Sequence, residues 1–360
     1  MKKTLLASTA FAGSMMLLGA TSALSQTTVS GNLNLSYKAI GNQGATANKL
    51  NSTEYFGKEI QINIANKGTL NNGLSYAAGF SIEQDGSQMS STASSTSGST
   101  DAIGVFSENV YIDLISGNTT FSVGADHVQN PDNEITNLVG IVDIDDNVSG
   151  IMNRAPNYVN NAGSAYQAFG IAAIQSTPVG NFSIRYTPDS TNGLASADDG
   201  ATGTAVNSFS AGEAQYEIGY VGSPAKGLTL QGFYSAKGTG ITGKSDLSSI
   251  TVGGKYNFGN FTAAISQKEQ DTLGAANIDV TTKTRAYGVA YAVTPNVTVG
   301  LNYAKTDQTG MTVDEKLTQV SVGYNLGAIY AGVSYAKAEN LDNVIDSKGN
   351  AGFVFMGTKF

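Results

Sequence analysis

The residues best able to do chemistry lie in one acidic stretch of the chain. Residues 126–153 contain several carboxylates and no lysine or arginine, the carboxylates of interest being Asp132, Glu134, Asp143, Asp145 and Asp146. The chain has no cysteine and a single histidine, His127, which excludes thiol catalysis, cysteine-based zinc sites and histidine-rich metal centres. An enzyme needs a nucleophile and a base within reach of each other. We therefore expect His127 to be non-catalytic and the protein not to be an enzyme.

The composition is unusual for a soluble globular protein. Of 360 residues only 13% are charged, whereas 43 are glycine and 17 are tyrosine. The mean hydropathy is −0.10, and no stretch beyond residue 25 approaches the ~20 consecutive apolar residues that a membrane-spanning helix needs. The formal net charge of −8 argues against a nucleic-acid partner.

The first 25 residues predict a secretory signal peptide. Two lysines precede an apolar run over residues 4–20, and the small residues Ala23 and Ser25 precede a cleavage site before Gln26. A membrane anchor is the alternative, but the apolar run is short and no stop-transfer segment follows it. Removal of residues 1–25 leaves 18 basic and 28 acidic residues, a net charge of −10.

Beyond the signal, the chain alternates between apolar and polar residues. Between Val29 and Lys38 the odd positions are apolar or small and the even positions are polar, and the same alternation recurs at Ile60–Ile64, Leu74–Ile82 and Val297–Tyr303. Successive side chains of a strand point to opposite faces, so each segment predicts a strand with one apolar and one polar face.

The connections between these segments alternate in length. The short ones are 68–73, 116–118, 178–181, 223–227, 257–260, 294–296 and 326–327, and the long ones are roughly 41–56, 85–104, 126–153, 189–210, 238–246, 271–280, 306–315 and 338–350. Fifteen connections imply sixteen strands. Short turns at one end and long loops at the other are the plan of an outer-membrane barrel. We expect residues 26–360 to form an all-β, transmembrane antiparallel β-barrel; a soluble β-sandwich or β-helix is the alternative.

The same pattern agrees with a wall between lipid and water. In hydrocarbon every backbone N–H and C=O must be paired, which only helices and closed barrels achieve. A lysine or arginine facing the bilayer midplane costs about 2–4 kcal/mol, and the apolar register of these segments carries almost none. Tyrosines near strand ends, such as Tyr37, Tyr234 and Tyr303, predict aromatic girdles at the two interfaces.

The last strand and several short motifs make a family resemblance specific. The amphipathic segment Gly352–Phe360 ends in an aromatic residue, and Phe360 resembles the signal by which Gram-negative outer-membrane proteins are recognised for assembly. Further matching stretches are Gln26–Gly31, Glu108–Leu114 and Phe121–Ala125, followed by a long loop. In this order they resemble the general Gram-negative porin family, which consists of trimeric, sixteen-stranded outer-membrane porins.

The resemblance implies a role for the acidic stretch. In this family the third long loop folds into the lumen and narrows it, so the five carboxylates named above would line a constriction. Cations on the wall would face them: lumen parity selects Lys38, Arg185 and Lys255, and Arg154 follows the loop. Lys38 and Arg154 match by location the basic cluster of the family, and Lys58 and Arg185 are secondary candidates. The alternatives are an acidic surface loop and solvated wall cations of no special role.

The function implied is a water-filled channel for passive diffusion of small hydrophilic solutes and ions, weakly cation-selective because the chain is acidic. The resemblance also implies a homotrimer in the Gram-negative outer membrane, in contact with lipid and lipopolysaccharide and delivered by the outer-membrane assembly machinery. No cofactor is expected, although the acidic loops could bind a divalent cation.

The alternative function is a substrate-specific channel or a structural or adhesive outer-membrane protein. A sugar-specific pore would carry an aromatic ladder on its inner face. The aromatic residues of inward parity are Tyr111, Phe233, Tyr330, Phe353 and Phe355, and they lie on scattered strands that form no clear ladder.

Overall fold

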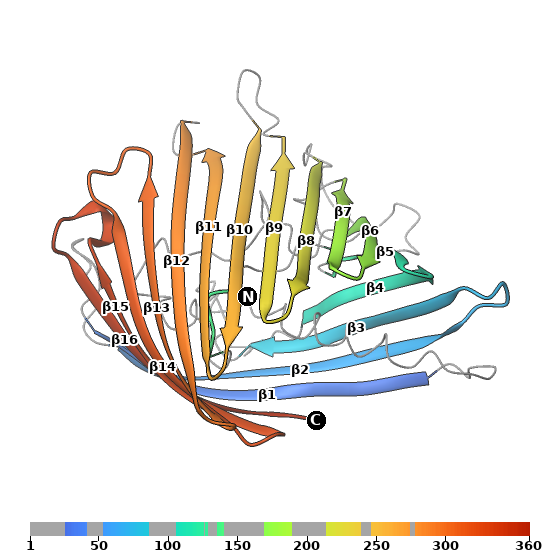
Figure 1. Ribbon diagram of the computed structural model, residues 1–360, viewed down its shortest axis with the longest axis horizontal. Coiled ribbons are helices and arrows are strands. Elements are labelled where there is room, and N and C mark those ends of the chain that lie inside the picture. Colours follow the sequence, from blue (N-terminus) through green and yellow to red (C-terminus); the bar gives the residue numbers. More distant parts are fainter. Residues whose placement is uncertain are drawn as a thin grey trace, which may run out of the picture.

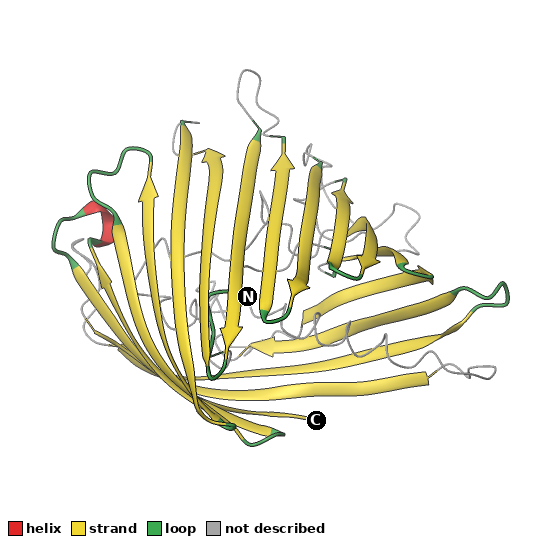
Figure 2. Cartoon of the chain, viewed as in Figure 1, coloured by secondary structure: helices red, strands yellow, loops and turns green. Residues whose placement is uncertain are grey.

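The described part of the chain is built almost entirely of β-strands (Figure 1). The computed structural model describes residues 26–41, 53–85, 106–125, 127–128, 135–139, 169–188, 214–238, 246–273 and 278–360. Helix is limited in this part to one short 3-10 segment, Leu341–Asn343 (Figure 2). Within the same ranges, no helix has both the length and the apolar character needed to cross a membrane.

The described residues form sixteen strands. They are β1 (Gln26–Gly41), β2 (Thr53–Thr69), β3 (Ser75–Asp85), β4 (Phe106–Ser116), β5 (Thr119–Ala125), β6 (Phe169–Thr177), β7 (Gly180–Thr187), β8 (Gln215–Ala225), β9 (Leu228–Lys237), β10 (Leu247–Phe258), β11 (Phe261–Leu273), β12 (Asp279–Thr294), β13 (Val297–Gln308), β14 (Glu315–Asn325), β15 (Ile329–Glu339) and β16 (Lys348–Lys359).

The sheet closes on itself. Each strand pairs antiparallel with its neighbours in sequence, and β1 pairs with β16, so the order is that of a closed barrel. The β1–β16 register runs from Asn32 opposite Lys359 to Gly41 opposite Asn350. Beyond β16, the Gly31 N–H donates to the Phe360 carbonyl oxygen at 2.9 Å and the Phe360 N–H donates to the Gly31 oxygen at 3.1 Å. Closure leaves no edge strand with unpaired backbone groups.

The period of two separates an outer from an inner face. On β14, Gln319 and Ser321 point inward and are 0% and 3% exposed, whereas Val320 and Tyr324 point outward and are 52% and 43% exposed. The other strands repeat this division, with outward residues such as Ile112, Val123, Ile184, Ile218, Val252, Ile265, Val289, Leu301, Val333 and Val354. The apolar surface of this protein is therefore on the outside of the barrel.

The sixteen-stranded antiparallel barrel predicted from the alternation is confirmed. The short turns fall where predicted, and the turn between β10 and β11 contains Gly259 with a φ of 63°, a left-handed conformation that glycine adopts without strain. Strand β6 is described from Phe169 onwards. Residues 154–168, where the sequence predicts the start of this strand, lie outside the described residues.

The seam between β1 and β16 generates a test of closure. A Cβ added to Gly31 would lie 2.6 Å from Cζ of Phe360 and would also meet the backbone oxygen of Gln61. Gly31→Val should therefore displace the Phe360 ring and destabilise the barrel by about 1–3 kcal/mol, the usual cost of overpacking. The measurement is the temperature at which the folded band disappears in electrophoresis of heated samples. Gly352→Ala is the control, since nothing lies within 4 Å of its added Cβ; equal transition temperatures for the two variants would contradict the prediction.

Candidate functional site

The inner face of the barrel carries charged side chains of both signs. Inward-pointing residues on the described strands include the acids Glu59, Glu83, Asp113, Glu217 and Glu315 and the cations Lys38, Arg185, Lys255 and Lys268. All of these except Lys255 are at most 9% exposed. The acids stand at polar positions of alternating segments, so parity could have found them, although sequence reasoning concentrated on the loop.

Three of the predicted wall cations point inward. Lys38 shares the inward register of Asn32 on β1 and is 3% exposed. Arg185 lies near the loop end of β7 and is also buried. Lys255 follows the inward register of Thr251 on β10 but stands three residues from the end of that strand at the short turn. The three therefore occupy different heights of the lumen.

The other two predicted cations do not join them in the described wall. Lys58 is exposed on β2 and pairs with Leu35, in the same outward register as Ile60, Ile62 and Ile64. Its Nζ donates to Oε1 of Gln84 at 3.4 Å on the outer surface. The prediction that Lys58 lines the pore is therefore wrong, because its position on β2 has the outward parity of Ile60 and Ile62. Arg154 lies outside the described residues.

Arg185 has a well-defined setting. Its direct cross-strand neighbour is Glu217 on β8, and both side chains point inward and are buried. Arg185 also donates to the hydroxyl of Ser183, and Gln215 donates to the Glu217 carboxylate. The cation is thus accompanied by a carboxylate on its own side of the lumen, and this wall segment carries opposite charges side by side.

The five predicted acidic residues, Asp132, Glu134, Asp143, Asp145 and Asp146, lie outside the described residues. Between them, however, the described segment 135–139 shows where part of this stretch runs. Ile135, Thr136 and Val139 are 7%, 1% and 7% exposed. Their contacts are with the inner face of the barrel.

Three glycines of the inward register form the contact surface for this segment. A Cβ on Gly253 of β10 would lie 2.9 Å from Cγ2 of Ile135, and one on Gly300 of β13 would lie 2.5 Å from Cγ2 of Val139. A Cβ on Gly288 of β12 would collide with the backbone oxygen of Thr136. Residues 135–139 therefore lie directly on the inner wall of β10–β13, at places where only glycine leaves room. No local sequence signal marks these glycines, since the contact joins residues more than a hundred positions apart.

The only histidine lies at the start of the same stretch. The His127 ring stacks on Tyr111 of β4, with ring centroids 4.0 Å apart, and its Nε2 lies 3.5 Å from Oδ2 of Asp113. Tyr111 and Asp113 both point inward. These contacts explain His127 as an anchor of the chain where it leaves β5, and no serine, threonine or lysine contact in the described part suggests a nucleophile beside it.

Three of the inward aromatic residues meet, contrary to the expectation of scattered positions. Phe353 and Phe355 stack with centroids 6.2 Å apart, and Tyr330 packs on Phe355 at 5.5 Å. The Tyr330 hydroxyl donates to Oδ1 of Asn34 at 2.5 Å, and Nζ of Lys359 lies 5.5 Å from the Tyr330 ring centroid. Pairing of β15 with β16 brings these residues together, a neighbour relation that parity alone does not give.

Several buried hydroxyls of the described inner face lack a protein partner. Within the described residues, the buried Oγ atoms of Ser122, Ser249 and Ser334 have no hydrogen-bond partner. A buried polar group left unsatisfied costs about 1–3 kcal/mol. In the same described part, no group of three or more His, Asp or Glu side chains is placed to hold a metal ion.

A closed barrel that is apolar outside and polar inside is a membrane-spanning channel. A family model described as "Gram-negative porin" matches residues 6–351, nearly the whole chain. The chain therefore belongs to the Gram-negative porin family, and it is an outer-membrane channel protein. A comparison with curated protein sequences found no match.

Solved structures with the same fold are distant in sequence. An anion-selective porin from Comamonas acidovorans is 16% identical, with a TM-score of 0.64 over 94% of this chain and 100% of that chain. OmpT of Vibrio cholerae, described as a trimer form, is 11% identical, with a TM-score of 0.59 over 94% and 100%. A mutant of Rh. blastica porin is 16% identical, with a TM-score of 0.58 over 93% and 100%. These likenesses support the fold.

The glycine contact surface generates a test at the lumen. Gly288→Leu would drive a side chain into Thr136 and bring its Cβ to 2.9 Å from Oδ1 of Asn302, so residues 135–139 must move off the wall. We expect an altered single-channel conductance in planar bilayers, whereas the control Gly254→Leu, which points outward from the same wall, should conduct as the parent does. Identical conductance of Gly288→Leu and the parent would mean that this segment does not limit the pore.

Proposed function

We propose that the protein is a passive channel through which small hydrophilic solutes and ions diffuse across the outer membrane, and that it is not an enzyme. The observation that carries this proposal is the division of the closed wall into an apolar outer face and a polar inner face that carries charges of both signs. A hydrated lumen lined by both signs of charge admits small polar solutes, whereas an apolar solute would have to displace ordered water.

We further propose that the carboxylates of the acidic stretch line the constriction and give a weak cation preference. Support comes from segment 135–139, because Glu134 immediately precedes residues that rest on the inner wall. Arg154, Arg185, Lys38 and Lys255 are the proposed opposing cations. The sign of selectivity depends on lining residues rather than on the fold, since a structural relative is an anion-selective porin.

A substrate-specific channel is the second candidate. The cluster of Tyr330, Phe353 and Phe355 lies beside the polar groups of Asn34 and Lys359, and since Phe353 and Phe355 are only 6% and 8% exposed, Tyr330 is the ring of this cluster that a solute could contact. An aromatic ring beside polar groups suits a sugar ring. Concentration-dependent block of the current by one solute class would favour this candidate over general diffusion.

The acidic constriction has a direct test. Asp143→Asn combined with Asp145→Asn should move the reversal potential in a salt gradient towards zero, because the variant removes two carboxylates from the proposed constriction. Asp246→Asn combined with Asp346→Asn is the control, since both residues are exposed in loop-end connections. A wild-type protein that is silent at every voltage would refute the channel, and unchanged reversal potentials would place the two carboxylates away from the pore.

A homotrimer is the proposed assembly. Strands β5, β6 and β7 have only 7, 9 and 8 residues, whereas β2 has 17. A tilted strand of 7 residues covers roughly 18 Å of height, less than the apolar band of about 25 Å in such barrels. Neighbouring copies of the chain could cover this low wall.

The trimer predicts a simple electrophoretic result. Unheated samples in mild detergent should migrate well above the chain mass of 37.1 kDa and collapse to the monomer position after boiling. A single monomer band before heating contradicts the proposal.

Residues 1–25 are the proposed signal peptide, with export before removal at Gln26. Phe360 is the proposed recognition element for the assembly machinery, supported by its position at the end of β16, where its ring is 64% exposed on the outer surface. The proposed surroundings in the membrane are lipid and lipopolysaccharide.

A further inference from the structure

On the outer face of β12–β15, residues of different chemical types are arranged in layers, and solute diffusion through the pore does not explain this arrangement. From the short-turn end towards the loop end, the outward positions pass from apolar residues through tyrosine or threonine to a cation and then to an acid. The orders are Val289, Tyr287, Arg285, Lys283 and Asp279 on β12; Leu301, Tyr303, Lys305 and Asp307 on β13; Val320, Thr318, Lys316 and Asp314 leading into β14; and Val333, Tyr335, Lys337 and Glu339 on β15.

The strand register assembles these cations into a row. Arg285 is directly opposite Lys305, and Lys305 is directly opposite Lys316. Like charges at directly opposite positions of a sheet destabilise it, and a bound anion would reduce this repulsion further than the carboxylates of the chain, such as Glu339 opposite Lys316, already do. Immediately below, Tyr287 is opposite Tyr303, with ring centroids 6.3 Å apart. The cations thus lie directly above an aromatic pair of the outer girdle.

Two of these lysines form ion pairs with carboxylates and still have exposed ammonium groups. Asp314 lies 2.5 Å from Nζ of Lys305, and Glu339 lies 2.7 Å from Nζ of Lys337. The two lysine side chains nevertheless remain 40% and 48% exposed. An ammonium has three donors, so each lysine can contact an anion while it keeps its carboxylate.

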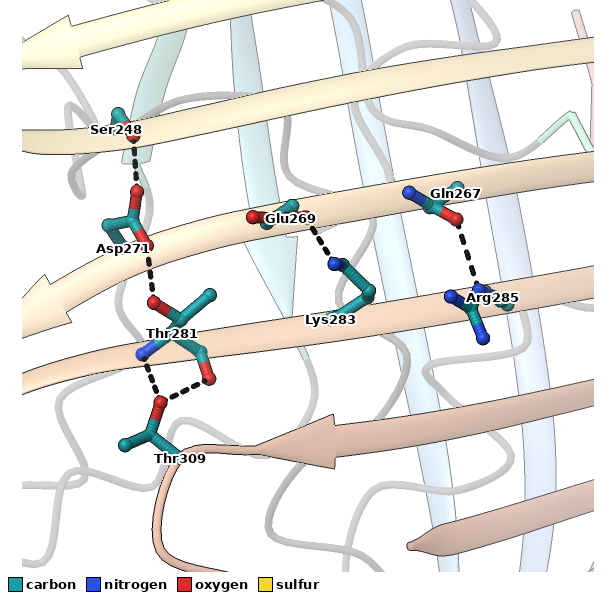
Figure 3. A network of polar contacts seen from close by, with 8 residues as sticks. All are labelled: Ser248, Gln267, Glu269, Asp271, Thr281, Lys283, Arg285 and Thr309. Atoms are coloured by element: carbon teal, nitrogen blue, oxygen red, sulfur yellow. Dashed lines mark hydrogen bonds and ion pairs between the residues drawn. The ribbon is translucent and has the colours of Figure 1, made fainter.

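The neighbouring network shows the same arrangement at β11 and β12 (Figure 3). Glu269 lies 2.7 Å from Nζ of Lys283, and Arg285 donates through Nε to Oε1 of Gln267 at 3.0 Å. The second acid of the network, Asp271, accepts from the hydroxyls of Ser248 at 2.9 Å and Thr281 at 2.7 Å. Asp271 is therefore held by hydroxyls, and the terminal nitrogens of Arg285 are available on the outer face.

Among the described strands, the full order is found on β12–β15, although single outward cations also stand on β2 (Lys58) and β16 (Lys348). On β9, β10 and β11, the outward position above the last apolar residue is Ala236, Ser248 or Gln267, none of them a cation. A general requirement for charge at the membrane surface would place cations around the whole circumference. The concentration on four consecutive strands points to a particular ligand.

We propose that the outer face of β12–β15 binds the phosphate groups of an anionic glycolipid in the leaflet at the loop ends, with its acyl chains along the apolar residues below the tyrosines. Tyrosine girdles mark the headgroup level, and basic residues at that level attract anionic headgroups. The fork of an arginine binds phosphate through two parallel hydrogen bonds. The outermost carboxylates suit the sugar hydroxyls of such a lipid. This inference rests on the proposed placement in the outer membrane, with the long loops outside.

The test uses the purified full-length protein in detergent, with diphosphorylated lipid A as the probe and lipid A stripped of phosphate as its comparison. Binding is measured by native mass spectrometry over a lipid titration. Arg285→Gln combined with Lys305→Gln should weaken binding of the diphosphorylated probe about 30-fold, since each basic residue at the surface contributes roughly fivefold. The charge-preserving exchange of Arg285→Lys with Lys305→Arg should restore most of the affinity.

The control is Lys67→Gln combined with Lys226→Gln, which removes the same charge from the short-turn end of the barrel, on β2 and in the turn between β8 and β9. This control should bind the probe as the parent does. Equal affinity for the two lipids, or equal loss in both double variants, overturns the proposal. Conductance in planar bilayers separates the lipid site from the channel. A parent protein that conducts but binds both lipids equally refutes the lipid site alone. A parent protein that does not conduct refutes the channel.

Discussion

The pairing of backbone groups in hydrocarbon is the constraint on which the whole structure depends. A strand can cross a bilayer only if each neighbouring strand satisfies its N–H and C=O groups, and the first and last strands satisfy each other only when the sheet closes. In this protein β1 and β16 meet over ten paired positions, from Asn32 with Lys359 to Gly41 with Asn350, and Phe360 extends the seam to Gly31. The inner and outer faces discussed below exist only because this wall is closed.

Closure gives the period of two its functional meaning. Once the wall is continuous, one set of alternate residues must face lipid and the other must face the lumen, so each strand contributes to solubility in the membrane and to the pore at once. Arg185 and Tyr186 illustrate the division: the first is buried beside Glu217 in the interior, and the second packs outside against Tyr216 at a centroid distance of 5.1 Å. A slip of one residue would exchange these environments.

Sequence reasoning captured what depends on this local period and missed what depends on contacts across the lumen. Strand number, turn positions and the inward direction of Lys38, Arg185 and Lys255 all follow from parity. Lys58 was misplaced, although the parity of its neighbours Ile60 and Ile62 indicates the outer face. Gly253, Gly288 and Gly300 could not be singled out, since a glycine in a strand looks the same whether or not segment 135–139 rests on it. The meeting of Tyr330 with Phe355 likewise needed the pairing of β15 with β16.

Two opposite sides of the barrel differ in strand length and in outward charge, and both differences bear on where partner copies would bind. In the ring of sixteen strands, β6 and β14 are eight places apart, so the low wall of β5–β7 is opposite the cation row of β12–β15 (Figure 1). The first side is too short for lipid to cover well, and the second presents charges at headgroup height. In a closed trimer, the side near the threefold axis is covered by protein, and the opposite side faces lipid. An interface over β12–β15 would instead bury the directly opposed Arg285, Lys305 and Lys316 against protein, and desolvating adjacent like charges is costly even where one of them has a carboxylate partner. Strand length and side-chain charge, two independent features, therefore assign the same side of the barrel to the proposed partner copies.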